Sequence, residues 1–428
     1  MIDIKMIRDN PDDIRNRLMK KGYDAAGEIV RILELDKSRR AVIADGESAK
    51  AEQNKLSKQF PEIKKAGGDT TELSAQLNML KETVKDADAK LREIEAELDS
   101  IMLGLPNPPD GDLAPGGKEN NEPVRFFGEP RTFDFPVKNH VDLCTELGLI
   151  DYPRGTKLSG SGFWLYRGMG TRLEWALLNF FLDTHIADGY EFILVPHMLE
   201  YQCGLTAGQF PKFADEVFKI ENSTDDRMRF MLPTAETALV SLHRDEIIPE
   251  EDLPKKYVSY TPCFRREAGT YGSDERGMVR GHQFNKVEMV QFTTPEGSDA
   301  AFDELVGKAE WLLKALDLHF RTVKLAAGDC SASMARTYDL EILIPSMDGY
   351  KEVSSVSNAR DYQARRGAMR LKRSDKTEFM HTLNGSGLAT SRIMPAIVEQ
   401  YQQADGSVVI PEVLRKYLGG AERLTPER

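Results

Sequence analysis

The stretch 263–292 has the greatest potential for chemistry in this sequence, because it combines cations, carboxylates and aromatic side chains. Residues 257–264 and 284–292 are rich in β-branched and aromatic residues, which predicts two strands joined by a glycine-rich charged loop. In the second strand Phe284, Lys286 and Glu288 share one face, and the first and last lie roughly 13 Å apart at about 3.3 Å per residue. With arginines nearby, this face could hold an adenine, phosphates and a cationic amine. Charge and periodicity alone also permit an ordinary solvated hairpin.

The order of residues in this stretch resembles motif 2 of class II aminoacyl-tRNA synthetases, most closely that of the seryl-tRNA synthetases. The resemblance implies that Arg265 contacts the α-phosphate of ATP, Glu267 the adenine edge and Arg280 the terminal phosphates. It also implies that Phe284 stacks on adenine and that Glu288 binds serine.

Arg266 is the one departure within this motif, since many family members carry a small residue there. We include it in the implied ATP-binding set, but we expect it on the strand face opposite Arg265.

Residues 231–238 contain a Thr-Ala-Glu sequence that by itself is typical of a helix N-cap, with Thr234 or Thr237 capping. In seryl-tRNA synthetases the matching loop closes over the amino acid. The resemblance therefore implies serine contacts from Thr234, Ala235 and Glu236.

The segment 351–358 reads Lys-Glu-Val-Ser-Ser-Val-Ser-Asn, which alone indicates only a serine-rich strand end. In the family, the matching glutamate and second serine hold magnesium and ATP. That implies Glu352 and Ser355 as metal ligands, and ATP contacts from Glu352, Val353, Ser354 and Ser355.

Residues 382–401 form a glycine-rich strand end that turns into a helix, and a helix start can bind an anion on physical grounds. The stretch is similar to motif 3 of the family. The similarity implies Asn384 and Ser386 beside the serine and Arg392 on the γ-phosphate of ATP. Arg265 and Arg392 are then the implied catalytic pair.

A mostly apolar helix is predicted at 173–186 and a strand at 190–196. A core helix and strand would explain both. The pair is also similar to motif 1, which forms the dimer interface in class II synthetases, so the resemblance implies a homodimer.

Two long amphipathic helices are predicted before residue 103. Apolar or small residues recur at spacings of three and four over 32–60, with weak positions, and again over 73–101. Pro61 and the turn 67–69 are expected to interrupt the pattern, and Asp69 with Glu72 resembles a capping box. Antiparallel pairing would give a coiled-coil hairpin on the order of 45 to 50 Å long.

The segment 37–65 carries eight lysines or arginines against four acids, a net charge of +4 within a chain of net charge −12. This favours a phosphate backbone as partner, although a dimerisation coil and a solvated surface stay open. The arm of seryl-tRNA synthetases looks like this and contacts the long variable arm and elbow of the tRNA.

The expected fold class is α+β. An N-terminal helical domain at 1–103, with an arm at about 27–102, precedes a proline- and glycine-rich linker at 104–118 and a catalytic domain at 119–428. His-x-Gly-His and Lys-Met-Ser-Lys-Ser are absent. The resemblance therefore implies an antiparallel sheet flanked by helices rather than a Rossmann fold.

The composition is that of a globular protein, with 40% hydrophobic and 29% charged residues and no apolar run long enough to span a membrane. The start lacks a secretory signal, and four scattered cysteines argue against a disulfide framework or structural zinc. We expect a cytoplasmic location.

The resemblance as a whole implies an ATP-dependent serine–tRNA ligase that uses Mg²⁺, L-serine and tRNA(Ser), with tRNA(Sec) as a further candidate. Two alternatives stay open. One is a ligase that loads a small amino acid onto a carrier protein, and the other is a non-catalytic RNA-binding paralogue.

Overall fold

The computed structural model describes residues 1–221, 228–267, 277–347 and 349–426, and the chain divides into two compact units. The smaller unit consists of Ile2–Met19 and Tyr23–Pro106. The larger unit consists of Asn107–Arg428 together with Met1 and Lys20–Gly22. We describe each unit by itself.

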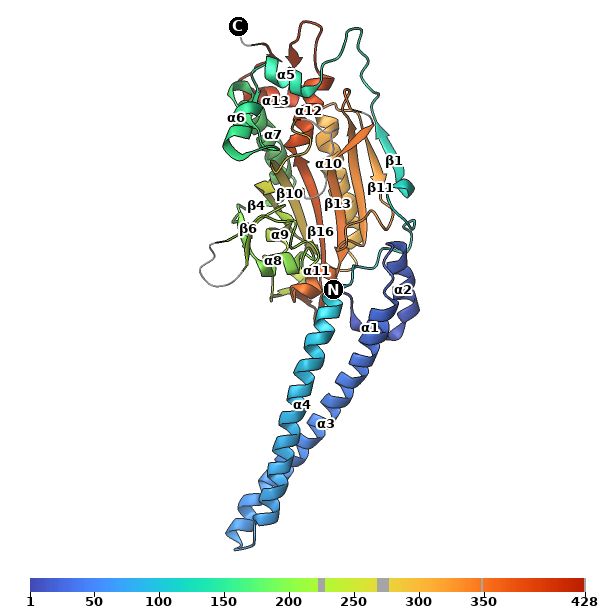
Figure 1. Ribbon diagram of the computed structural model, residues 1–428, viewed down its shortest axis with the longest axis vertical. Helices are drawn as coiled ribbons and strands as arrows, with labels where there is room; N and C mark the ends of the chain where they lie inside the picture. Colours follow the sequence, from blue (N-terminus) through green and yellow to red (C-terminus); the bar gives the residue numbers. More distant parts are fainter. Residues whose placement is uncertain (222–227, 268–276, 348, 427–428) are drawn as a thin grey trace. The chain divides into compact units, whose positions relative to one another are not determined.

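The smaller unit is a long antiparallel helical hairpin preceded by two short helices (Figure 1). Its elements are α1 (Ile4–Asp9), α2 (Pro11–Lys20), α3 (Ala26–Lys65) and α4 (Thr71–Gly104). The predicted seam is confirmed, because every apolar heptad position is buried or half-buried while most other positions are exposed. At Gly46 an added Cβ would lie 3.3 Å from the Cβ of Ala87, so small residues let the two helices approach closely. Arg39 Nε also donates to Glu95 Oε1 across the hairpin at 3.1 Å.

The expected break at Pro61 is wrong, since α3 continues through it to Lys65. A proline costs one backbone hydrogen bond, and a position close to the helix end with a packed partner helix tolerates that cost. The turn expected at 67–69 is confirmed, since α4 begins at Thr71. The capping box of Asp69 with Glu72 is wrong, because the N-cap position is Thr70, although the Asp69 carboxylate accepts the Thr71 N–H at 2.9 Å.

The larger unit is built on an eight-stranded sheet in the order β1-β11-β12-β13-β16-β10-β9-β4. Every neighbouring pair is antiparallel except β4 with β9. This confirms the expected antiparallel architecture. The strands are β1 (Glu122–Phe127), β4 (Glu191–Phe192), β9 (Lys255–Phe264), β10 (Gln283–Thr293), β11 (Phe320–Lys324), β12 (Arg336–Leu343), β13 (Tyr350–Arg360) and β16 (His381–Ala389).

Three helices cover one face of this sheet and enclose the main core: α7 (Gly168–Ala187), α10 (Ser298–Ala315) and α12 (Thr390–Gln400) (Figure 1). Alternate residues of the central strands enter that core, for example Val287 and Met289 of β10 and Leu383 of β16. The residues between them therefore point to the opposite face.

Shorter elements surround the sheet. They are α5 (His140–Glu146), α6 (Tyr152–Ser159), α8 (Tyr201–Thr206), α9 (Glu236–Leu239), α11 (Tyr362–Arg366) and α13 (Glu412–Arg415), with the small strands β2 (Ile150–Asp151), β3 (Leu165–Tyr166), β5 (Met198–Glu200), β6 (Lys219–Ile220), β7 (Arg229–Met231), β8 (Ile247–Pro249), β14 (Arg370–Lys372), β15 (Thr377–Phe379), β17 (Val408–Val409) and β18 (Arg423–Leu424). Among the described residues, no helix combines the length and apolarity needed to cross a membrane.

The helix predicted at 173–186 is confirmed within α7, but the strand predicted at 190–196 shortens to β4, Glu191–Phe192. β4 is an edge strand that pairs only with β9 in the described chain. The chain leaves the sheet before Pro196, as expected for a residue that cannot donate a ladder hydrogen bond.

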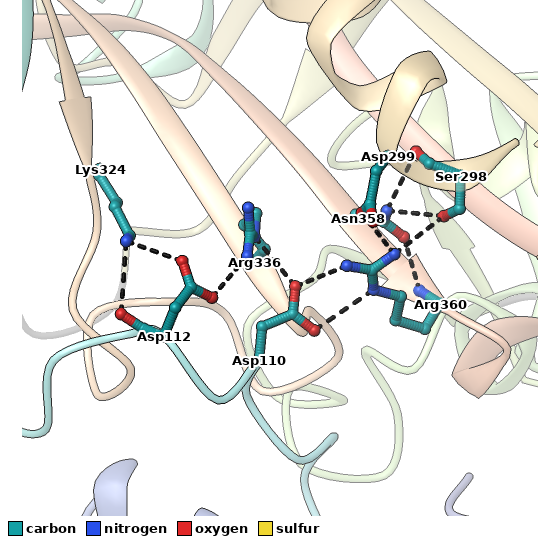
Figure 2. Close-up of polar contacts among 8 residues, drawn as sticks. All are labelled: Asp110, Asp112, Ser298, Asp299, Lys324, Arg336, Asn358 and Arg360. Carbon is teal, nitrogen blue, oxygen red and sulfur yellow. Dashed lines mark hydrogen bonds and ion pairs between the residues drawn. The ribbon is translucent and has the colours of Figure 1, made fainter. Parts of the chain in front are cut away.

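The segment after α4 has no regular structure, yet side-chain contacts fix it to the larger unit. The buried Asn107 amide donates to the carbonyl oxygens of Ser333 and Ala359 at 2.9 and 2.8 Å. Figure 2 shows the Asp110 carboxylate between the guanidinium groups of Arg336 and Arg360, with nearest distances of 2.9 and 2.7 Å. The proline- and glycine-rich composition therefore does not leave this segment loose.

Candidate active site

A cavity of about 360 Å³ opens on the sheet face opposite the main core, and the first turn of α12 contributes to its wall. Phe284, Lys286 and Glu288 of β10 line it, as the two-residue period predicts, while Val287 and Met289 lie in the core behind. The cavity gathers residues that lie far apart in the sequence. The predicted site residues on its wall are Thr234, Glu236, Arg265, Glu267, Arg280, Phe284, Glu288, Glu352, Val353, Ser355, Asn384, Ser386 and Arg392.

Three residues of the implied set do not line the cavity. Ala235 is buried as the residue before α9, and Ser354 points into the strand layer, where its hydroxyl donates to the Ser386 carbonyl oxygen at 2.7 Å. Arg266 donates to the carbonyl oxygen of Asp215 at 2.5 Å. Both Arg265 and Arg266 follow the end of β9 at Phe264, so the expectation that they occupy opposite faces of a strand is wrong.

One end of the cavity holds a buried network of carboxylates and their donors around Glu236 and Glu288. Glu288 is paired with the ammonium group of Lys286, and its Oε1 accepts from the amide of Asn384 at 3.1 Å. The same amide lies 3.3 Å from Glu236 Oε2, and the Gln363 amide donates to Glu236 Oε1 at 2.9 Å. This end therefore presents two fixed carboxylates side by side.

Thr234 joins this network, although the helix N-cap suggested for Thr234 or Thr237 is wrong, because the N-cap position of α9 is Ala235. The Thr234 hydroxyl accepts from Lys286 Nζ at 2.8 Å and lies 3.4 Å from Glu288 Oε2. Its oxygen also accepts the backbone N–H of Glu236 at 3.3 Å. The threonine thus fixes the loop and its two acidic neighbours together.

Burial raises the pKa of Glu236 to about 7, and the neighbouring Glu288 carboxylate adds to this effect. The Gln363 amide, Lys286 and Arg265 oppose it. Two further buried polar atoms of the wall, Asn384 Oδ1 and Ser386 Oγ, have no hydrogen-bond partner among the described residues. Unpaired buried polar atoms are costly, so this end of the cavity is built for a polar ligand that carries a positive charge.

The middle of the cavity combines an aromatic face with cations. The Arg265 guanidinium carbon lies 5.3 Å from the centroid of the Phe284 ring, and Arg265 Nε donates to the Pro233 carbonyl oxygen at 3.4 Å. Arg280 Nη1 donates to Glu267 Oε2 at 3.0 Å. This arrangement offers a flat stacking surface, a hydrogen-bonding carboxylate and two arginines for phosphate.

Arg392 lies in the first turn of α12, so its charge adds to the positive end of that helix. Its Nε donates to the Val279 carbonyl oxygen at 3.2 Å, and its Nη1 donates to the Glu352 carbonyl oxygen and lies 3.7 Å from that carboxylate. The guanidinium is therefore held at the cavity wall. It is positioned to meet an anion.

Glu352 and Ser355 reach the same side of β13 through an irregularity that the sequence does not show. In a regular strand, residues three apart point to opposite faces. Here Leu340 pairs with Ser354 but Glu341 pairs with Glu352, so Val353 is an extra residue in a β-bulge. Ser355 Oγ consequently lies 3.2 Å from Glu352 Oε1.

Asp339 on β12 lies beside this pair and was not predicted. Its Oδ1 accepts from Ser355 Oγ at 2.6 Å, and burial together with the Glu352 carboxylate raises its pKa well above the usual range. Hard oxygen donors with excess negative charge suit Mg²⁺. The described residues contain no group of three or more His, Cys, Asp or Glu side chains placed to hold a metal ion.

Other wall residues were also missed. The two-residue period placed Lys286 on this face of β10, but no role in the site was predicted for it. Ser331, Ser333 and Met334 belong to a loop whose place depends on the tertiary fold, and Lys21 Nζ holds it by donating to the Ser331 and Met334 carbonyl oxygens at 2.8 and 2.7 Å.

Comparison with known families gives two matches. Residues 1–109 match the seryl-tRNA synthetase N-terminal domain, and residues 218–401 match the tRNA synthetase class II core domain (G, H, P, S and T). The chain is 56% identical to serine–tRNA ligase 2 of Clostridium acetobutylicum over 423 residues, which cover 98% of this chain and 99% of that protein.

Two solved structures are similar throughout their length. Seryl-tRNA synthetase from Pyrococcus horikoshii, complexed with ATP, has a TM-score of 0.93 and 33% identity, with 100% of both chains covered. Cytoplasmic serine–tRNA ligase from Naegleria fowleri, in complex with AMP, has a TM-score of 0.89 and 28% identity, with 100% of this chain and 99% of that chain covered.

Proposed function

The chain belongs to the seryl-tRNA synthetases, and from this premise we infer how its residues divide the work of that reaction. The enzyme activates L-serine with ATP to form seryl-adenylate and pyrophosphate, then transfers serine to the 3′ end of tRNA(Ser). These matches favour this activity over the carrier-protein ligase and the non-catalytic paralogue. The division of roles below is our proposal.

The end of the cavity around Glu236 and Glu288, which we call the serine end, binds the amino acid in this proposal. The observation that carries it is the pair of unpartnered buried atoms, Asn384 Oδ1 and Ser386 Oγ, beside the carboxylates Glu236 and Glu288 among the described residues. Carboxylates suit the α-ammonium group, and the unpaired oxygens suit the serine hydroxyl. If alanine bound instead, those oxygens would stay unpaired, and such a site can favour the correct substrate over the analogue by roughly 10⁴-fold or more.

ATP occupies the middle of the cavity, with adenine stacked on Phe284 and its edge read by Glu267. Arg265 holds the α-phosphate, and Arg280 and Arg392 hold the terminal phosphates. The serine carboxylate attacks the α-phosphorus, the bond to the bridging oxygen breaks, and pyrophosphate leaves. Because two anions must approach each other, positive charge and positioning contribute more than a general base does.

Glu352 and Ser355, with Asp339 beside them, are the groups that would hold Mg²⁺. When bound, the ion supplies positive charge that neutralises the phosphates during the attack. The bulge at Val353 supports this assignment, because it turns both side chains to the same side of β13.

The helical hairpin is proposed to bind tRNA(Ser), and tRNA(Sec) is a further candidate. Seven of the eight cations between 37 and 65 are exposed, and Arg39 alone of these is half-buried. A net positive, solvent-facing surface attracts a phosphate backbone. The seam of the hairpin is already closed by its own partner helix, which argues against a dimerisation coil.

A homodimer is proposed through the motif-1-like region. Trp175, Ile186, Phe192 and Leu194 are 48%, 44%, 41% and 71% exposed, although all four are large and apolar. Large apolar side chains exposed within one stretch of the chain are consistent with a protein interface. We also propose a cytoplasmic location, which is supported by four free cysteines, because thiols stay reduced in that compartment.

Serine-dependent exchange of pyrophosphate into ATP tests the assignment of the cavity. The Arg265→Ala variant should lose exchange while it keeps its unfolding midpoint, because this exposed side chain makes few contacts. Exchange at the normal rate in this variant would refute the role given to Arg265.

A further inference from the structure

Lys286 is a buried lysine with no role in the assignment above. It lies on β10 between Phe284 and Glu288 and is only 8% exposed. An ammonium group in such a place is costly unless it is paired and hydrogen-bonded. Its Nζ pairs with Glu288 Oε2 and donates to Thr234 Oγ1 at 2.8 Å.

The two carboxylates of the serine end differ in their partners. Glu288 has the ammonium group of Lys286 on one oxygen and the Asn384 amide on the other. Glu236 has only neutral donors, the amides of Gln363 and Asn384. Within the described residues, no lysine or arginine forms an ion pair with Glu236.

The ion pairs of the two carboxylates differ in the same way. Glu288 pairs with Lys286, whereas Glu236 forms no ion pair among the described residues, although Arg265 faces it. Glu236 is therefore the carboxylate with which the α-ammonium group of an amino acid can pair. Since Lys286 already occupies Glu288, the open position is at Glu236.

We propose that Lys286 is a positioning residue of the serine site, which occupies Glu288 and thereby reserves Glu236 for the α-ammonium group of serine. This inference deepens the proposed function and rests on it. Lys286 acts through its neighbours and does not touch the reacting atoms. Its ammonium group pairs with Glu288 and so keeps the pocket from taking a second cation there.

The electrostatics of Glu236 agree with this geometry. The charged groups that face it are Glu288 and Lys286 from β10 and Arg265 after β9, while Gln363 from α11 is neutral. Burial and Glu288 raise its pKa to about 7 in the free pocket, and Lys286 opposes the rise. The buried Cys263 thiol on β9 is a further titratable group near Lys286, and burial raises its pKa.

The test compares Lys286→Gln and Lys286→Met with a matched control, Lys256→Gln. Lys256 lies on the neighbouring β9, is 24% exposed and pairs with Glu304 Oε1 at 2.7 Å, outside the cavity. Serine-dependent exchange is measured from pH 6 to 9, varying serine and ATP separately. We expect the KM for serine at pH 7 to rise at least tenfold in both Lys286 variants, while the KM for ATP changes less than twofold.

The pH profile separates positioning from mere structural support. Without Lys286 the pKa of Glu236 rises further, so the acid limb of 1/KM for serine should move to higher pH. If the pKa rises by about one, serine binding on that limb weakens about tenfold. Lys256→Gln should leave the limb unchanged. An unmoved limb, or KM values for serine and ATP that rise together, would overturn the proposal.

If neither variant folds, titration calorimetry on the unmodified enzyme decides. Serine binding in the presence of a non-hydrolysable ATP analogue, measured in buffers of different ionisation enthalpy, should release about half a proton at pH 7 and almost none at pH 8. No release between pH 6 and 7 would overturn the proposal. Failure of the unmodified enzyme to exchange pyrophosphate with serine would instead refute the proposed function.

Discussion

Replacing Glu236 by glutamine should make the fold more stable at alkaline pH while it weakens serine binding. The carboxyl is buried, and its pKa is raised from 4.5 to about 7. A carboxyl whose pKa is raised by folding destabilises the fold above its unfolded pKa, and the full cost is reached only above its folded pKa. A rise in pKa of this size corresponds to about 3 kcal/mol at pH 8, and the cost vanishes below about pH 4.5.

Glutamine recovers most of this free energy. It can still accept the hydrogen bond from Gln363, but its own amide group would face the Asn384 donor, which is 3.3 Å from Glu236 Oε2. Allowing about 1 kcal/mol for this mismatch leaves a gain of about 2 kcal/mol at pH 8. For a unit of this size, the melting temperature rises by about 3 °C.

The assay is thermal unfolding of the enzyme and of Glu236→Gln at pH 5 and pH 8, with serine-dependent pyrophosphate exchange alongside. Glu412→Gln, an exposed position in the first turn of α13, is the control and should change neither. Loss of the charge partner should raise the KM for serine about a hundredfold. A variant that is no more stable at pH 8, or that gains equally at pH 5, would refute the reasoning.

Three further predictions concern other parts of the molecule. Ser386→Ala removes one buried unpaired oxygen, so it should reduce the preference for serine over alanine in pyrophosphate exchange by about tenfold. An unchanged ratio of the serine and alanine rates would contradict the placement of Ser386 at the serine hydroxyl. Asp110→Asn should lower the free energy of unfolding by about 2 kcal/mol in denaturant titration, because Arg336 and Arg360 lose their shared carboxylate. A change below about 0.5 kcal/mol, as expected for a surface site, would show that these two ion pairs do not stabilise the fold. Removing residues 27–101 should spare pyrophosphate exchange and cripple tRNA charging, and normal charging would remove the role given to the hairpin.

The sequence predicts the cavity well where a single strand carries the information. Strand periodicity places Phe284, Lys286 and Glu288 on one face of β10. The role of Lys286 follows only from the structure, in which its ammonium group donates to the Thr234 hydroxyl. Heptad spacing likewise predicts the hairpin. Both patterns repeat a local geometry that needs no knowledge of the rest of the fold.

Features that depend on register or on distant segments could not be read in this way. The bulge at Val353 is visible only once β12 is paired with β13, and the same pairing brings Asp339 to Ser355. The segment after α4 looked like a loose linker because its anchors, Arg336 and Arg360, lie more than two hundred residues further on.

Transfer of labelled serine to purified tRNA(Ser), with ATP and Mg²⁺ and with alanine, threonine, glycine and cysteine as competitors, tests the central claim most directly. We expect charging that depends on ATP, that only unlabelled serine suppresses, and that Glu236→Gln slows strongly at serine concentrations near the KM of the unmodified enzyme. Charging that alanine suppresses as well as serine does, or that is unchanged in Glu236→Gln at that serine concentration, would contradict the serine site described above.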